Sequence, residues 1–414
     1  MPTPSTGPSV AWRGRAVAAH LMAVMLIVGL AGCGAPAPST PAPAAPTASA
    51  PAALTPAAPA LPTAAALPPT LPAAALNTQF PPIVAPSDNP TTPEKVELGR
   101  QLFYDPVLSA SNAMSCATCH HPDLGFSNGA PSSTPRPGAP GRNVPTLWNV
   151  ATVRHLQWDG RVESLEAQAV DPLTLPSEMA AAPQEIEKEL RAIPAYVELF
   201  DAAFGGGQQA VSFDNVTRAL AAFQRTLLSR DSRFDRFIAG DAAALTAQEQ
   251  RGLALFFAPE THCAECHQPP TFAHETFRVI GVPSEDPGRA GVSPTGVRGA
   301  FRVPTLRNAA RSAPYMHNGS LATLEEVVHF YAEGAGRADG NTGVDPLLKG
   351  FDLSGQDKSD LAAFMWALTD ESALPAVPEQ ALSGLPVTPR IVNPARSIPV
   401  SLAARGKKNR RTQE

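Results

Sequence analysis

Apolar residues recur at helical spacing over most of the chain between residues 92 and 370. In the segment 213–229 every third or fourth position carries a large apolar side chain, at Val216, Leu220, Phe223 and Leu227. The same spacing occurs over residues 163–170, 184–192, 195–203, 245–257, 324–331 and 357–368. No segment shows a convincing strand-like alternation of apolar and polar residues. The pattern therefore predicts a mainly α-helical fold.

Another helix is expected to begin near residue 92. Thr92 is a good capping residue, and Pro93 suits the first turn, where its missing amide hydrogen would have no partner in any case. The apolar positions Leu98 and Leu102 then continue the helical pattern.

Residues 1–33 have the order of an export signal. Arg13 and Arg15 precede the apolar run 21–30, and Ala31-Gly32-Cys33 follows it. The run is too short to span a membrane comfortably. Residues 30–33 also resemble the lipobox of bacterial lipoproteins, in which the cysteine carries the lipid. We expect a lipoprotein-type signal peptide and a periplasmic or cell-surface protein anchored to the membrane through Cys33; an ordinary cleaved signal is the alternative.

Two further segments lack a pattern that could build a core. Residues 34–76 are almost entirely Ala, Pro, Thr and Ser, a composition that favours a disordered, extended tether. Residues 371–414 are again rich in proline and finish with a basic stretch, so we predict a loosely packed strap and a solvated tail. The whole chain carries 32 basic and 37 acidic side chains, and this balance gives no indication of a nucleic-acid partner.

The pattern Cys-x-x-Cys-His occurs twice. Its residues are Cys116, Cys119 and His120, and then Cys263, Cys266 and His267. In c-type haem attachment the two thiols bind the haem vinyl groups and the histidine ligates the iron. A single Cys-x-x-Cys is also compatible with zinc binding or a redox pair, but two copies that both end in histidine favour haem. With Cys33 set aside, the motifs use all remaining cysteines and leave none for a structural disulfide.

The 414 residues are enough for two or three domains. Each half of the helical region holds one motif, with a helix before it and helices after it. We therefore predict two cytochrome c-like domains, residues 92–235 and 236–370, each with one covalently bound haem c.

Over roughly residues 92–370 the chain resembles the bacterial di-haem cytochrome c peroxidase and MauG family. The matching motifs occur in the family's order and are residues 99–106 (GRQLFYDP), 116–129 (CATCHHPDLGFSNG), Arg142-Asn143-x-Pro145-Thr146, Trp158-Asp159-Gly160-Arg161, Leu165-Glu166-x-Gln168, Glu178-Met179, and 303–308 (VPTLRN) leading to 314–319 (PYMHNG). The resemblance implies an enzyme that activates hydrogen peroxide at the first haem and exchanges electrons through the second.

The resemblance also assigns roles to single residues. His120 would ligate the first iron and leave its other face open for peroxide, with Glu178 as the distal carboxylate that moves a proton and Gln168 as the distal amide. Trp158 would lie between the haems. From the residues alone, Glu178 would be a surface acid on a loop and Trp158 a core aromatic. Finally, the family's inter-haem calcium ion falls on Asn143, Ser312 and Pro314, where oxygen ligands suit that ion; the family usually has threonine in place of the serine.

Two departures distinguish branches of the family. In the peroxidases a histidine from the loop after the first motif caps the first iron, whereas residues 130–141 contain no histidine. The first haem is therefore expected to be open without prior reduction. The second departure is the far ligand of the second haem, which is methionine in the peroxidases and falls on Tyr331 here, as in MauG.

The Tyr331 assignment has alternatives. From the residues alone, Tyr331 ends an apolar stripe that includes Leu324 and Val328, and such a tyrosine normally packs in the core. Met316 and His329 are the other candidate ligands nearby. A tyrosinate would favour ferric iron, whereas methionine raises the potential and suits a haem that receives electrons.

The leading hypothesis is a MauG-like oxidoreductase in which two oxidising equivalents from hydrogen peroxide are used to remove two electrons from a protein or other substrate through the second haem. One alternative is a conventional cytochrome c peroxidase that receives electrons from a small carrier protein. The other is a non-enzymatic di-haem electron carrier, which would need no acid–base group such as Glu178 beside an open iron.

Overall fold

The computed structural model describes residues 79–132, 141–337, 340, 343–372 and 374–391. The expected signal peptide, the tether, Cys33 and the basic tail lie outside the described residues. The chain divides into two units, Met1–Ala60 and Leu61–Glu414, and the helical region lies wholly in the second. Within the described ranges, no helix combines the length and apolar character needed to cross a membrane.

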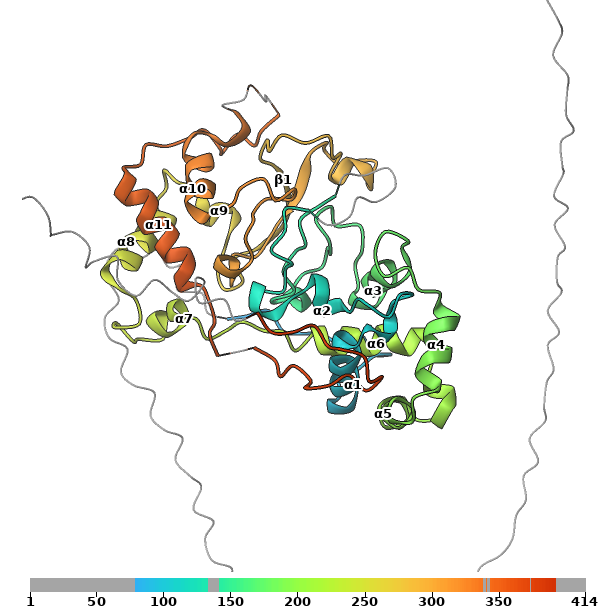
Figure 1. Cartoon of the computed structure of the whole chain (residues 1–414). Helices are drawn as coiled ribbons and strands as arrows, with labels where there is room; N and C mark the ends of the chain where they lie inside the picture. Colours follow the sequence, from blue (N-terminus) through green and yellow to red (C-terminus); the bar gives the residue numbers. More distant parts are fainter. Residues whose placement is uncertain (1–78, 133–140, 338–339, 341–342, 373, 392–414) are drawn as a thin grey trace, which may run out of the picture. The chain divides into compact units, whose positions relative to one another are not determined.

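The fold is mainly helical, as the sequence predicts (Figure 1). The first half contains α1 (Pro93–Tyr104), α2 (Cys116–Cys119), α3 (Leu165–Thr174), α4 (Pro183–Arg191), α5 (Pro194–Phe204) and α6 (Phe213–Gln224). The second half contains α7 (Arg233–Ile238), α8 (Ala247–Phe256), α9 (Cys263–Cys266), α10 (Leu324–Ala332) and α11 (Gly355–Ala367). Short 3-10 turns connect several of these helices.

The prediction that strands are lacking is wrong at one place. β1 (His274–Val279) and β2 (Ala300–Val303) form a two-stranded antiparallel sheet, with Arg278 opposite Phe301. Almost every residue of β1 is half-buried, so neither face of the strand is clearly apolar or clearly polar. Without alternating burial, the sequence carries no strand-like pattern there.

The two halves repeat the same helix pairing. α1 packs against α6 in the first half, and α8 packs against α11 in the second. At the first crossing, a Cβ atom on Gly99 would lie 2.0 Å from the carbonyl oxygen of Ala219. At the second, a Cβ atom on Gly252 would lie 1.9 Å from the carbonyl oxygen of Asp360. Each pair therefore needs a glycine where the two backbones meet.

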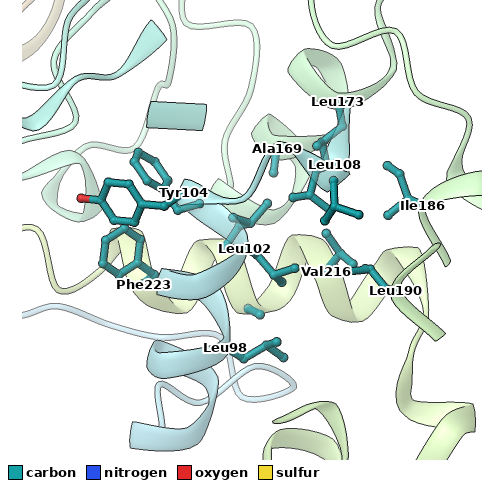
Figure 2. Packing of buried hydrophobic residues seen from close by; sticks show 14 of the residues in the cluster. Leu98, Leu102, Tyr104, Leu108, Ala169, Leu173, Ile186, Leu190, Val216 and Phe223 are labelled. Atoms are coloured by element: carbon teal, nitrogen blue, oxygen red, sulfur yellow. The ribbon is translucent and has the colours of Figure 1, made fainter. Parts of the chain in front are cut away.

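Each half also has its own hydrophobic core. Figure 2 shows part of the first, in which Leu98 and Leu102 of α1 lie beside Val216 and Phe223 of α6. The second core gathers side chains from α7, α8, α10 and α11 around Phe272, and includes Phe234, Phe256, Leu324 and Phe364. Two separate cores agree with two cytochrome c-like halves.

The C-terminal strap returns to the first half, where Figure 1 draws it in dark red near α1 and α2. Ser383 bonds to Asp105 at the end of α1, and Arg390 forms an ion pair with Asp123. Its apolar side chains Val377, Leu382 and Leu385 pack on the first core. The described part of the strap, residues 374–391, therefore contacts the first half at several points.

Candidate haem-binding site

The two Cys-x-x-Cys segments form matching one-turn helices, α2 and α9. In each, the histidine follows directly and its backbone amide bonds to the carbonyl of the first cysteine, at 2.8 Å for His120 and 2.9 Å for His267. The backbone angles of the two histidines are nearly identical, with φ −110° and ψ 70° at His120 and φ −108° and ψ 76° at His267. Both imidazoles therefore leave the chain in the same direction relative to the two thiols.

A backbone carbonyl fixes each imidazole. Nδ1 of His120 lies 3.0 Å from the carbonyl oxygen of Phe126, and Nδ1 of His267 lies 3.1 Å from that of Phe272. Each histidine also forms a hydrogen bond with the backbone of a proline, Pro145 for His120 and Pro304 for His267. A carbonyl that accepts from Nδ1–H selects the tautomer in which Nε2 can ligate a metal. Burial lowers the pKa of both histidines and favours this neutral form.

The thiols do not resemble those of a redox pair. Burial raises the pKa of Cys116 to about 12 and that of Cys263 to about 11, so both stay protonated at neutral pH. Redox-active cysteines instead have a lowered pKa because the thiolate is stabilised. The donor set, two thiols and one oriented imidazole in each half, fits covalent haem.

A second repeated segment stands behind each histidine. Residues 144–149 (VPTLWN) and 303–308 (VPTLRN) share the pattern Val-Pro-Thr-Leu-x-Asn. The hydroxyl of Thr146 donates to the Gly125 carbonyl at 2.7 Å, and that of Thr305 donates to the Thr271 carbonyl at 2.6 Å. Both threonines thus support the turn that presents a carbonyl to the histidine. This repeat is visible in the sequence but was not among the predicted features.

Trp158 forms a hydrogen bond with the residue that precedes each repeated segment. Its indole Nε1 donates to the Asn143 carbonyl at 2.8 Å, and its own carbonyl accepts from the Arg302 amide at 2.8 Å. Asn143 precedes the first Val-Pro-Thr and Arg302 precedes the second. Trp158 is therefore held by both halves of the protein, as an inter-haem residue would be.

Buried ion pairs hold the same region in place. Arg142 bonds to Asp159 at 2.8 Å and to Asp286 at 2.6 Å, and Arg161 also bonds to Asp159. Burial by itself would raise the pKa of Asp159, but the hydrogen bonds from Arg161 and Arg142 hold that pKa below its usual value. Since Asp159 follows Trp158 and Asp286 lies in the second half, Arg142 links the loop of Trp158 to the second half.

A cavity adjoins the second motif, and we call it the second cavity because it lies at the second motif. It is lined by Cys263, Cys266 and His267, by Trp158, and by many apolar side chains, among them Val303, Leu324, Val328, Phe351 and Met365. Such a mainly apolar cavity with a few polar groups is typical of a cofactor site. The macrocycle of a haem attached at α9 would find suitable walls here.

Two of the three candidate ligands line this cavity. Tyr331 on α10 does so, and burial raises the pKa of its phenol, with smaller contributions from Cys266 and Cys263. Met316 also lines it. His329, in contrast, has a side chain that is 60% exposed, with its Nδ1 3.0 Å from Nζ of Lys358. The geometry of the described residues therefore leaves Tyr331 and Met316 as candidates.

Of the two predicted distal residues, Glu178 interacts with the first motif. Glu178 sits in the turn after α3, and its carboxylate is close enough to Cys119 to raise that thiol's pKa, after the larger effect of burial. Gln168 is half-buried on α3, and its amide has no hydrogen-bond partner among the residues that the structure covers. α3 itself is fastened through Glu166, whose carboxylate bonds to Arg225 and Asn89.

The three predicted calcium residues share the wall of the cavity. The side-chain amide of Asn143 donates to the Pro314 carbonyl at 3.2 Å, which places these two residues side by side. The Ser312 hydroxyl donates to the Ala309 carbonyl, so its own backbone oxygen remains the group it would offer. No cluster of three or more His, Cys, Asp or Glu side chains suited to a metal occurs in the described ranges. Amide and carbonyl oxygens are nevertheless ligands that calcium accepts.

The two-core fold and the two oriented Cys-x-x-Cys-His sites define a di-haem c-type cytochrome. Residues 93–243 match the family described as "Di-haem cytochrome c peroxidase". The chain belongs to this di-haem cytochrome c peroxidase and MauG family, and it is a haem-dependent oxidoreductase that acts with hydrogen peroxide.

Three relatives illustrate the likeness. The methylamine utilization protein MauG of Methylorubrum extorquens is 41% identical over 303 residues, which cover 71% of this chain and 83% of the relative. Cytochrome c551 peroxidase of Pseudomonas aeruginosa is 37% identical over 250 residues, 58% of this chain and 72% of the relative. Among solved structures, a MauG-like protein associated with microbial copper homeostasis superposes with a TM-score of 0.66 at 35% identity, covering 75% of this chain and 98% of that protein.

Proposed function

We propose that this protein is a MauG-like enzyme that uses hydrogen peroxide to oxidise a protein substrate through its second haem. The observation that carries the proposal is Tyr331, which lines the second cavity beside Cys263 and Cys266. A tyrosinate ligand favours oxidised iron and suits a haem that withdraws electrons from a substrate. Two MauG proteins, at 41% and 39% identity, support this branch.

Bound at the two motifs, the haem irons supply the cleavage of the peroxide O–O bond and the removal of two electrons from the substrate. The chain supplies the proton transfer and the positioning. Glu178 takes a proton from the peroxide oxygen nearer the iron and returns one to the leaving oxygen, and Gln168 orients the peroxide. Trp158 offers an oxidisable ring that both halves hold in place.

A conventional peroxidase that is served by a small electron-carrier protein is the second candidate. The observation in its favour is that Met316 also lines the second cavity, because methionine ligation suits a haem that receives electrons. The likeness to cytochrome c551 peroxidase points the same way.

Stopped-flow mixing of the fully oxidised protein with hydrogen peroxide separates the two candidates. For a MauG-like enzyme, the haem absorption changes at once without prior reduction. Tyr331→His is expected to retain both haems but to lose the change in haem absorption that peroxide causes in the oxidised wild type. Met316→Leu is expected to retain both haems and this change. Glu178→Gln should slow peroxide cleavage about 10²–10⁴-fold with both haems retained. If the oxidised protein does not react until a carrier has reduced it, the proposal is wrong.

We further propose that the protein is exported and held at the membrane through a lipid on Cys33, and that Asn143, Ser312 and Pro314 bind one calcium ion. The sequence of residues 30–33 supports the anchor, and the hydrogen bond between Asn143 and Pro314 supports the ion site. Fractionation tests the anchor: wild type should sediment with membranes and Cys33→Ser should be released. Calcium removal by a chelator should perturb Trp158 fluorescence, since Asn143 bonds to the indole.

A further inference from the structure

The ionisable groups that line the second cavity are nearly all accounted for. Arg278 forms an ion pair with Asp345, at 2.7 Å, and His262 pairs with Glu265. His317 stacks on Phe301 at 3.9 Å between ring centroids, and burial lowers its pKa to about 4, so it is neutral near pH 7. Among these groups, Arg302 is left as a cation without an anion.

Arg302 lies in β2 and is one of the residues that line the cavity. Among the residues that the structure describes, its Nε is sealed from solvent and has no hydrogen-bond partner. Within the same residues, its Nη1 donates to the carbonyl of the next residue, Val303, at 3.3 Å. Among the described residues, no carboxylate oxygen lies within 4.0 Å of the guanidinium.

Glu275 is the carboxylate that acts on Arg302 over a longer range. It is already engaged with the first half, because it accepts from the amides of Arg154 and His155 and lies 3.2 Å from the His155 ring. Burial outweighs the Glu275 charge and lowers the pKa of Arg302. An arginine in a protein nevertheless stays charged, and a half-buried charge is stabilised by a counter-ion.

We propose that Arg302 pairs with a propionate carboxylate of the haem bound at Cys263 and Cys266. The guanidinium offers two parallel N–H donors to such a group, and the cavity that it lines is the one beside that haem's attachment site. The proposal rests on haem attachment at α9, and not on the choice between a protein substrate and an electron carrier.

This pairing would connect the second haem to Trp158. The Arg302 amide holds the Trp158 carbonyl at 2.8 Å, so one residue positions the haem edge and the indole together. The equivalent residue of the first half is the uncharged Asn143. The second haem would therefore have a fixed positive charge beside it, and the first haem would have none at the matching place. A positive charge favours the reduced iron, so it raises the reduction potential of the second haem.

The test is the midpoint potential of the second haem in the full-length holoprotein, measured by spectroelectrochemistry at several pH values. Arg302→Gln should lower that potential. Its freed propionate should also titrate in the range of ordinary carboxyls, about pH 4–6, so that the potential falls as pH rises through this range. The matched control Arg298→Gln removes the same charge from a side chain that is 66% exposed, and should change neither property.

Arg302→Lys completes the test because it keeps the charge. It should retain both haems by pyridine haemochrome assay and a potential near that of wild type, with no added pH dependence. If Arg302→Gln loses the second haem while Arg302→Lys keeps it at the wild-type potential, the proposal stands. If Arg302→Gln matches Arg298→Gln at every pH, or if Arg302→Lys behaves like Arg302→Gln, the proposal is overturned.

Discussion

Asp105 fastens the C-terminal strap to the first half. It follows α1, is fully buried, and accepts four hydrogen bonds. Its Oδ1 accepts from the amide of Val107 at 3.0 Å and from the hydroxyl of Ser383 at 2.6 Å. Its Oδ2 accepts from the phenol of Tyr196 at 2.7 Å and from the amide of Ser383 at 3.1 Å. Each oxygen faces one backbone amide, that of Val107 at Oδ1 and that of Ser383 at Oδ2, and an amide N–H can only donate, so this position requires two acceptor oxygens.

Asp105→Asn tests that requirement without changing the volume of the side chain. An asparagine keeps one of the two oxygens and places an NH₂ group where the other oxygen was, facing its two donors. Two hydrogen bonds to a charged group are then lost, each worth about 1.5–3 kcal/mol. Relief from burying a charge offsets part of this loss. We expect the free energy of unfolding to fall by about 3 kcal/mol, which corresponds to about 6–12 °C in melting temperature.

The assay is thermal unfolding followed by circular dichroism. Asp214→Asn is the control, since that carboxylate is 67% exposed and pairs only within its own helix; its loss should cost less than about 0.5 kcal/mol. Ser383→Ala removes one of the four bonds and should cost about 1 kcal/mol. In the double variant the two losses should not add, because both act on one contact. Equal melting temperatures for Asp105→Asn and Asp214→Asn would refute the anchoring role.

Three further predictions follow from the site and the helix pairs. A pyridine haemochrome assay should return two covalently bound haems per chain, and His267→Ala should perturb the spectrum of the second haem only. Trp158→Phe should keep both haems yet slow substrate oxidation more than peroxide cleavage, because it removes the oxidisable ring and the bond to Asn143; equal slowing of both steps would contradict this role. Gly252→Ala should lower thermal stability strongly, as its Cβ would meet the Asp360 carbonyl at 1.9 Å, whereas Gly355→Ala, which meets nothing within 4 Å, should not.

The long helices could be predicted from the sequence because their apolar spacing is local. The helix expected over 213–229 illustrates the limit, since α6 ends at Gln224. After Gln224 the chain bonds to Asn149, the last residue of the first Val-Pro-Thr-Leu-x-Asn segment. The Leu227 carbonyl accepts from the Asn149 amide, and the backbone of Ser229 forms two hydrogen bonds with the Asn149 side chain. The helix ends where the backbone bonds to Asn149 instead, and the spacing of apolar residues does not indicate partners that are distant in the sequence. α2, α7 and α9 were not predicted as helices because they are too short to show a period.

The haem-binding site also has residues that could be predicted from the sequence and residues that could not. Cys-x-x-Cys-His is a local pattern, so the attachment residues could be read directly, whereas the carbonyls of Phe126 and Phe272 come from turns that a motif does not specify. Arg302 was not foreseen at all. What distinguishes it is that its Nε has no hydrogen-bond partner among the described residues, which no pattern in the sequence indicates.

Differences between the two haem sites must arise outside the parts that the halves share. The halves repeat the helix pair, the glycine crossing, the histidine angles and the Nδ1 hydrogen bond, which differs by only 0.1 Å between 3.0 and 3.1 Å. Equal scaffolds would give equal haems. We therefore expect any difference in chemistry between the two sites to come from residues that the other half does not repeat, such as Glu178 beside the first motif, and Arg302 and Tyr331 at the second cavity. Trp158 also has no counterpart, and it alone bonds to the residue before each repeated segment, Asn143 in the first half and Arg302 in the second. This position is what the predicted role between the two haems requires.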